Sequence, residues 1–158
     1  MNIVNETPKN INELLKMAND KLNWKIRMDA IQKMRKYNCE AVRDKIASMA
    51  LCDRVFIVKK EAYKAAQSLK ITVSGKPIFL SKKDTGYKLN DFKELFGIIK
   101  KQSKMEKIDI KKIKERMKIL NPEMYDVMLC EKGKKFDTWI KDIYGALPKE
   151  KYKIILCT

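Results

Sequence analysis

The chain has 158 residues, of which 45% are hydrophobic and 35% charged, and its formal net charge is +16. This length fits one compact domain or two small lobes, and the apolar content is high enough to build a core, which argues against disorder. The sequence contains no histidine. That absence removes histidine-based acid–base, nucleophilic and metal-binding chemistry from consideration.

The positive charge has two interpretations. An excess of basic residues favours acidic partners such as nucleic acid or an acidic protein surface. However, 31 of the 36 basic residues are lysine and only five are arginine. Proteins that read phosphates and bases commonly rely on the planar fork of arginine. The charge can therefore be functional, or it can reflect the general composition of the chain.

The cysteines and the apolar runs indicate the kind of environment. The four cysteines form no CxxC pair, so we expect reduced thiols, no zinc site and no cofactor. Residues 1–9 lack the cationic start and apolar core of a signal peptide. No apolar run approaches the roughly 20 residues that a membrane helix needs. We expect a cytoplasmic protein with no membrane partner.

Apolar residues recur at helical spacing through the first 70 residues. The pattern predicts helices over residues 9–19, 24–37, 39–51 and 53–69. Thr7 fits the N-cap of the first helix, and Pro8 fits its first turn. Short breaks between these helices favour antiparallel helical hairpins.

Two of these helices repeat each other. A shift of 32 residues superposes Ile26, Arg27 and Ala30 on Val58, Lys59 and Ala62. Asp20 and Asp53 precede the two units at similar distances. An acidic residue, a hydrophobic–basic pair and small apolar positions in this order resemble the HEAT family and its short bacterial HEAT-like variants. The resemblance covers residues 20–70.

The resemblance implies stacked helical hairpins that present a surface to a partner. In such a stack, the basic position held here by Arg27 and Lys59 pairs with an acidic residue of a neighbouring repeat. Two units are fewer than the three or so that usually bury a continuous core, so we expect the rest of the chain to cap the repeats.

The repeat pattern ends at residue 71. Residues 71–73 and 78–80 are short β-type runs around Ser74-Gly75-Lys76-Pro77, which predicts a small β-hairpin at about 71–80. Helices are expected over residues 89–103, 109–120, 121–131 and 136–147, with Asp109 and Asn121 as N-caps. The apolar tail 152–156 suits a strand or an extended arm.

Together these patterns predict an all-α protein. Its HEAT-like helical hairpin repeats span residues 1–70, a connector with the small hairpin spans 71–88, and a helical C-terminal lobe spans 89–158.

The candidate binding site rests on charge density. Residues 100–118 hold nine basic and three acidic residues, although their helical spacing spreads them over more than one face. Basic residues of the first hairpins are also free to contact a partner. The candidate residues for binding nucleic acid or an acidic partner are Arg35, Lys36, Arg43, Lys100, Lys101, Lys104, Lys111 and Lys112.

Three functions remain open at this stage. A non-catalytic module that binds nucleic acid, a nucleoprotein complex or another acidic partner accounts for the charge on a repeat scaffold. A protein–protein adaptor accounts for the scaffold if the basicity is compositional. A DNA glycosylase of the HEAT-like type is the enzyme alternative, but no catalytic aspartate and aromatic pair can be matched residue by residue. Trp24 and Trp139 lie on apolar helix stripes, which favours core packing. The sequence does not indicate whether the protein is a monomer or an oligomer.

Overall fold

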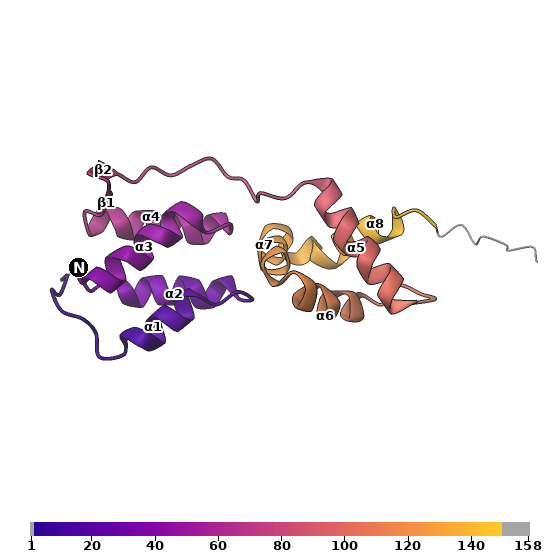
Figure 1. The fold of residues 1–158 in the computed structure, drawn as a ribbon, viewed down its shortest axis with the longest axis horizontal. Helices are drawn as coiled ribbons and strands as arrows, with labels where there is room; N and C mark the ends of the chain where they lie inside the picture. The colour runs from indigo at the N-terminus through magenta and orange to yellow at the C-terminus, as the bar shows by residue number, and fades with distance from the viewer. Residues whose placement is uncertain (1, 150–158) are drawn as a thin grey trace, which may run out of the picture.

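The computed structural model describes residues 2–149. It contains helices α1 to α8 and a short antiparallel hairpin, arranged as two lobes joined by an extended connector (Figure 1). The predicted all-α class with a small β-hairpin is confirmed. The predicted tail at 152–156 lies outside the described residues.

The N-terminal lobe is a stack of two helical hairpins. It consists of α1 (Ile11–Ala18), α2 (Trp24–Met34), α3 (Glu40–Cys52) and α4 (Phe56–Ser68). Within the hairpins, α1 packs on α2 and α3 packs on α4, and between them α2 contacts α4 and α1 contacts α3. Buried alanines in α2, α3 and α4 allow this close approach, since they add little side-chain volume between the helices.

The start of α1 differs from the prediction. The N-cap is Asn10 rather than Thr7. The Ile11 N–H donates to the carbonyl of Pro8 (3.1 Å), so residues 8–11 form a turn before the first helical residue. Pro8 therefore lies in that turn and not inside the helix.

The hairpin is shorter than predicted. Strand β1 (Thr72–Val73) pairs with β2 (Lys76–Pro77), in a register that places Val73 opposite Lys76. The two residues between the strands, Ser74 and Gly75, both have positive φ (51° and 74°), as the tight mirror-image turns of two-residue hairpins require. This turn places the second strand at residues 76–77, and the prediction of 78–80 is wrong.

The connector continues from the hairpin along α4. Ile71 and Ile78 are buried and fix both arms of the hairpin to the lobe. Further along, the Lys59 Nζ of α4 donates to the Ser81 Oγ of the connector (3.0 Å). Residues 78–88 therefore run antiparallel to α4 and back toward the second lobe (Figure 1).

The C-terminal lobe contains the other four labelled helices. They are α5 (Leu89–Ser103), α6 (Ile110–Leu120), α7 (Pro122–Lys132) and α8 (Phe136–Gly145), with a 3₁₀ turn, η1 (Gly133–Lys135), before α8. Asp109 accepts from the Lys112 N–H (3.1 Å) and Asn121 accepts from the Met124 N–H (3.0 Å), which confirms both predicted N-caps. A single residue separates α6 from α7, so Asn121 serves as the end of one helix and the cap of the next.

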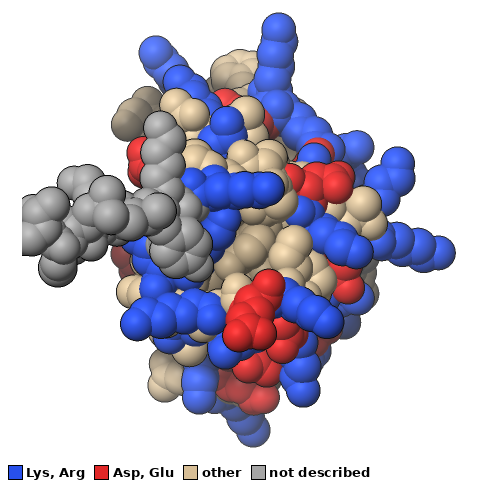
Figure 2. Space-filling model, turned by 90° about the vertical axis from the view of Figure 1, so that its right-hand side faces the viewer, with Lys and Arg blue, Asp and Glu red and all other residues tan. Residues whose placement is uncertain are grey.

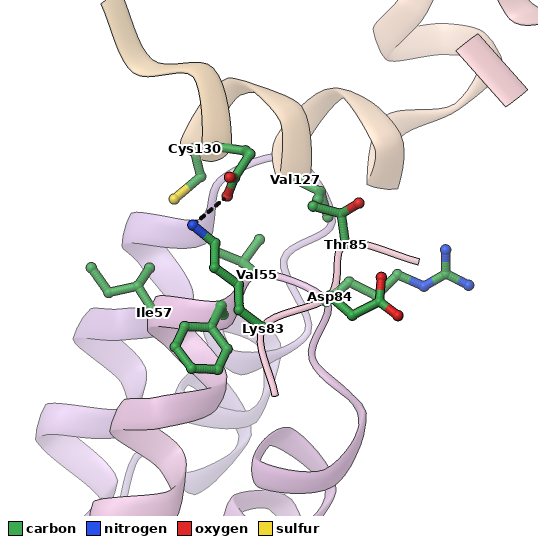
Figure 3. A pocket seen from close by; sticks show the side chains of 10 residues that line it. Val55, Ile57, Lys83, Asp84, Thr85, Val127 and Cys130 are labelled. Carbon is green, nitrogen blue, oxygen red and sulfur yellow. Dashed lines mark ion pairs between the residues drawn. The ribbon is translucent and has the colours of Figure 1, made fainter. Parts of the chain in front are cut away.

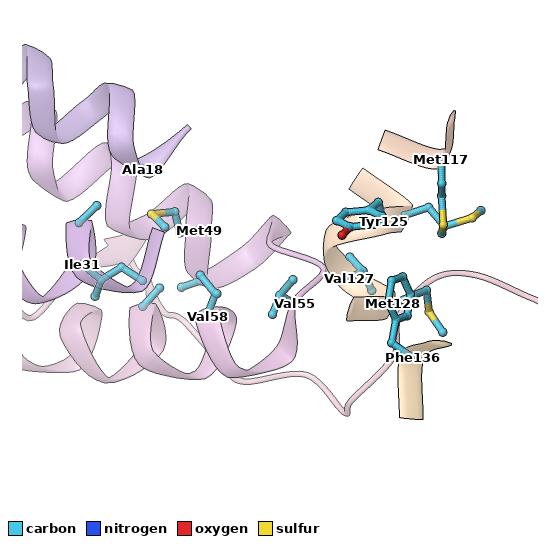
Figure 4. Packing of buried hydrophobic residues seen from close by; sticks show 14 of the residues in the cluster. Ala18, Ile31, Met49, Val55, Val58, Met117, Tyr125, Val127, Met128 and Phe136 are labelled. Atoms are coloured by element: carbon cyan, nitrogen blue, oxygen red, sulfur yellow. The ribbon is translucent and has the colours of Figure 1, made fainter. Parts of the chain in front are cut away.

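Aromatic rings fill the interior of this lobe. Trp139 packs against Phe92, Phe96 and Phe136, with ring centroids 5.0 to 5.7 Å apart, and Phe136 also meets Tyr125 edge-on. The interpretation of Trp139 as a core residue agrees with these contacts. Figure 4 shows buried side chains of both lobes, with Val55 and Val127 on facing sides of the junction.

The C-terminal lobe does not cover the helical stack. It abuts the ends of α2 and α4, where these helices begin, and α7 is the element next to them (Figure 1). The expectation that the second lobe caps the repeats therefore differs from the structure. This end-on arrangement leaves the outer side of α4 uncovered except along the edge where the connector runs.

A buried charge cluster joins the lobes. The Arg27 guanidinium donates to both oxygens of Asp53 (2.9 and 3.0 Å) and to the Asp126 carboxylate of α7 (2.6 Å). The other oxygen of Asp126 accepts from the Trp24 N–H (2.8 Å) at the start of α2. The side chains of Arg27, Asp53 and Asp126 are only 10%, 8% and 2% exposed. Asp126 thus binds both a cation and a helix N-terminus across the junction.

Substitutions in this cluster should have unequal effects. Arg27→Leu leaves two carboxylates buried without a cation and should lower the free energy of unfolding by about 3–5 kcal/mol. Asp126→Asn leaves Arg27 with its two bonds to Asp53, so the loss should be about 1–2 kcal/mol. Asp29→Asn, which breaks an exposed ion pair with Lys33, is the control and should change stability by less than about 1 kcal/mol. Urea unfolding measures all three, and equal losses for Arg27→Leu and Asp126→Asn would contradict the cluster's asymmetry.

Candidate nucleic-acid interface

The structure places the candidate residues of the first lobe in partly internal roles. Arg43 donates to Asn38 and to the carbonyl of Leu69 (2.8 Å), at the C-terminal end of α4, so its charge stabilises that helix end. Arg35 lies near Glu61 (3.7 Å). Lys36 is exposed. Of these three residues, only Lys36 has a side chain without such contacts, so they do not form a single cationic surface.

The candidates of the second lobe lie apart from those of the first. Lys101, Lys104, Lys111 and Lys112 are exposed, whereas Lys100 is half-buried over the ring of Tyr144 (5.8 Å). Figure 2 views this end of the molecule, and its basic side chains project separately with acidic and uncharged surface between them. The structure therefore brings Lys100 and Lys101 together on α5 but does not join all eight candidates.

Other basic residues of the 100–118 run have contacts inside the lobe. Lys114 pairs with Asp137 and lies over the Phe136 ring, and Lys118 lies over the Tyr125 ring (5.0 Å). Arg116 donates to Gln102. These contacts reduce the charge that the densest run in the sequence offers to a partner.

A second basic surface lies on α4 and the connector. Residues 54–88 hold nine basic residues and two acidic ones, Glu61 and Asp84. We call the exposed and half-buried side chains of residues 54–88, which comprise the residues at the start of α4, α4 itself and the connector, the α4–connector face. Its basic residues are Arg54, Lys59, Lys60, Lys64, Lys70, Lys76, Lys82, Lys83 and Lys88.

The antiparallel course of the connector brings these charges together. It places Ser81 beside Lys59 and residues 83–85 beside the start of α4. Lys83 is anchored to Glu131 of α7 (3.0 Å) across a small cavity of about 230 Å³, seen in Figure 3. The connector is thus fixed at both ends along the helix.

Five lysines of this face remain available to a ligand. Arg54 is committed, because it pairs with Glu123 (2.8 Å) and stacks on Tyr87. Lys64 pairs with Glu61 across one exposed helical turn, an interaction of little strength. Five exposed lysines have no ion pair within residues 2–149: Lys60, Lys70, Lys76, Lys82 and Lys88.

The junction between the lobes is the strongest electrostatic feature, but its groups are already paired. A cleft of about 620 Å³ lies there, with Arg27, Asp53 and Asp126 among its lining residues. Burial disfavours the charge of Arg27, but the hydrogen bonds and charges of Asp53 and Asp126 outweigh it and raise the pKa of the guanidinium. Burial, together with the nearby charge of Asp53, raises the pKa of Asp126 despite its hydrogen bonds from Arg27 and from the Trp24 N–H.

The residues at the junction are better suited to a structural role than to catalysis. Both oxygens of Asp126 accept hydrogen bonds from protein groups, which gives the carboxylate a structural role at the junction. Cys130 lies nearby, and burial together with Asp126 and Glu131 raises the pKa of its thiol, which keeps the thiol protonated and weakly nucleophilic. Within residues 2–149, no group of three or more His, Cys, Asp or Glu residues is arranged to hold a metal ion.

No helix among residues 2–149 combines the length and the apolar character needed to span a membrane. Comparisons with protein-family models, curated protein sequences and solved structures found no match.

Local density of basic residues does not indicate the α4–connector face. Its nine basic residues are spread over 35 positions and alternate with apolar ones, whereas residues 100–118 hold nine in a short run. A count of net charge rather than of basic density would have found it, because acidic residues are rare between 54 and 88. Residues 100–118 also include lysines that pack over aromatic rings.

The raised pKa of Asp126 gives a pH dependence with a definite sign. Because protonation of Asp126 is more favourable in the folded than in the unfolded protein, its titration adds stability as the pH falls through the raised folded value, and this added part is complete below the ordinary pKa of 3.8. Relative to Asp126→Asn, the wild type should therefore gain free energy of unfolding as the pH falls from neutral toward 3.8. Urea unfolding of both proteins over this range tests it, and a difference that grows toward neutral pH would contradict it.

Proposed function

We propose that this protein is a non-catalytic, HEAT-like helical module that binds nucleic acid through the α4–connector face. The observation that carries the proposal is that five exposed lysines of α4 and the connector have no ion pair among residues 2–149, while residues 54–88 contain only two acidic residues. An excess of exposed ammonium groups of this kind favours binding to the negatively charged backbone of nucleic acid.

The architecture also favours this surface. The helical stack ends at α4, and the C-terminal lobe docks at the helix ends rather than over α4. The pairing of Arg27 with Asp53 supports the HEAT-like interpretation, because the basic residue of one hairpin meets the acidic residue of the next. Lys59, the equivalent position in the second unit, instead contacts Ser81 of the connector.

A protein–protein adaptor is the second candidate, and a different surface favours it. An apolar groove of about 490 Å³ lies beside α5, with Gly97, Leu147 and Pro148 among its lining residues and lysines at its rim. Recovery of one specific protein that resists nuclease treatment, and is lost on Gly97→Glu but retained after charge reversal on α4, would favour this function.

A glycosylase activity is the weakest alternative, because each oxygen of the buried junction aspartate already accepts a hydrogen bond from the protein. Incubation with alkylated DNA, followed by measurement of released bases, tests it directly. Release of bases that depends on Asp126 would overturn the non-catalytic proposal.

Charge reversal can locate the binding surface. Lys60→Glu combined with Lys82→Glu should weaken binding to a labelled oligonucleotide about tenfold or more, because both lysines are exposed and neither supports the fold. Lys111→Glu combined with Lys112→Glu is the matched control on α6 and should change affinity less than about twofold. Fluorescence anisotropy at low salt measures both pairs. A larger loss for the α6 pair would move the interface to the second lobe.

The salt dependence gives a second test of the same interface. If the five unpaired lysines all contact phosphates, log affinity should fall with log salt at a slope of about −3 to −5. The Lys60/Lys82 reversal should flatten this slope, and the α6 control should not. Binding that does not change with salt, or that is undetectable at low salt, would refute the proposal.

A further inference from the structure

A groove on the α4–connector face is built from both charged and aromatic groups. It has a volume of about 420 Å³ and lies between the C-terminal half of α4 and the hairpin. Tyr63, Gln67 and Lys70 line it from the helical side, and Phe79 lines it from the connector. Its volume falls within the roughly 300–1,000 Å³ typical of small-molecule sites, so it can admit a planar ring system.

Phe79 stands in solvent at the edge of this groove. Its side chain is 78% exposed, the largest value among the exposed large hydrophobic residues of the described chain. The neighbouring Ile78 is only 7% exposed, because side chains alternate in an extended segment and Ile78 takes the inward position. The backbone thus holds Phe79 outward, where it contributes little to the core.

Polar groups in the groove are suited to the edge of a base. The Gln67 side-chain amide donates to the Tyr63 hydroxyl (2.7 Å), which fixes both side chains on the exposed flank of α4. This bond leaves the hydroxyl proton of Tyr63 and the amide oxygen of Gln67 available. A donor and an acceptor therefore lie beside an exposed aromatic ring.

Two lysines lie in or next to the groove. Lys70 lines it directly, and Lys76 belongs to the strand whose next residue, Pro77, also lines it. Both lysines are exposed, and neither has an ion pair among the residues that the structure describes. Phosphates on either side of an inserted base could be neutralised by these two ammonium groups.

We propose that this groove binds single-stranded nucleic acid, with an unstacked base against Phe79 and the flanking phosphates on Lys70 and Lys76. This inference rests on the proposed function and narrows its ligand. Aromatic side chains stack on bases that are free of a duplex partner, and a cationic track holds the backbone of the strand. In a duplex, the faces of the bases are already stacked, so Phe79 selects single strands.

The test compares two oligomers that differ only in their bases. Oligothymidine of about 15 nucleotides and an abasic oligomer of the same length carry equal phosphate charge. Wild-type protein should bind oligothymidine more tightly. Phe79→Ala should weaken binding to oligothymidine about 5- to 100-fold and leave binding to the abasic oligomer and to duplex DNA unchanged.

Matched variants isolate the ring. Phe79→Tyr keeps the stacking surface and should retain the affinity for oligothymidine. Ile119→Ala removes a 69% exposed side chain from α6 and should leave the affinities for oligothymidine and for the abasic oligomer unchanged. Oligouridine is tested alongside, and equal losses on DNA and RNA support recognition through stacking.

The failures are distinguishable. If wild-type protein binds none of the oligomers at low salt, the proposed function itself is wrong. If it binds them all and Phe79→Ala changes nothing, the single-strand inference is overturned and the nucleic-acid interface stands. If sedimentation velocity shows that Phe79→Ala dissolves a self-associated species, Phe79 is a contact between copies and the inference is also overturned.

Discussion

One guanidinium, that of Arg27, determines how the two lobes meet. A charged group with so little solvent exposure is tolerable only when its partners are close and its hydrogen bonds are complete, and here two carboxylates from different lobes supply them. Asp126 simultaneously receives the first N–H of α2, so the beginning of a helix, a buried charge and a lobe contact coincide. Apolar contacts such as Val55 opposite Val127 accompany this cluster, but the directional bonds fix the orientation.

This attachment has a consequence for the rest of the surface. Because α7 is held at the helix ends, the second lobe cannot lie over α4, and the stack finishes with one helix flank open. The connector must then travel the length of that flank to reach α5, and it carries its own lysines with it. The basic face is therefore produced jointly by the position of the lobe and the path of the linking segment. Neither α4 nor the connector would form it alone.

Some local features of the structure could be predicted from the sequence, whereas the long-range contacts could not. Asp109 and Asn121 were identifiable because a cap bonds within three residues of itself. The second β-strand was misplaced because backbone φ at Ser74 and Gly75, rather than apolar character, sets the register. The partnership of Arg27 with Asp126 spans 99 residues, and no local pattern indicates it. The α4–connector face depends on the same kind of information, since it appears only after the connector has folded back.

Arginine and lysine have different roles in this protein, which accounts for the small number of arginines. All five arginines have contacts within the protein: Arg27, Arg35, Arg43, Arg54 and Arg116 bond to carboxylates, amides or carbonyls. The exposed unpaired charge on α4 and the connector belongs to lysine. Arginine guanidinium groups thus make contacts within the fold, and lysine ammonium groups supply the exposed charge. Chemical neutralisation of the lysine amines would therefore remove the exposed charge of this face and leave the Arg27 guanidinium that joins the lobes unchanged.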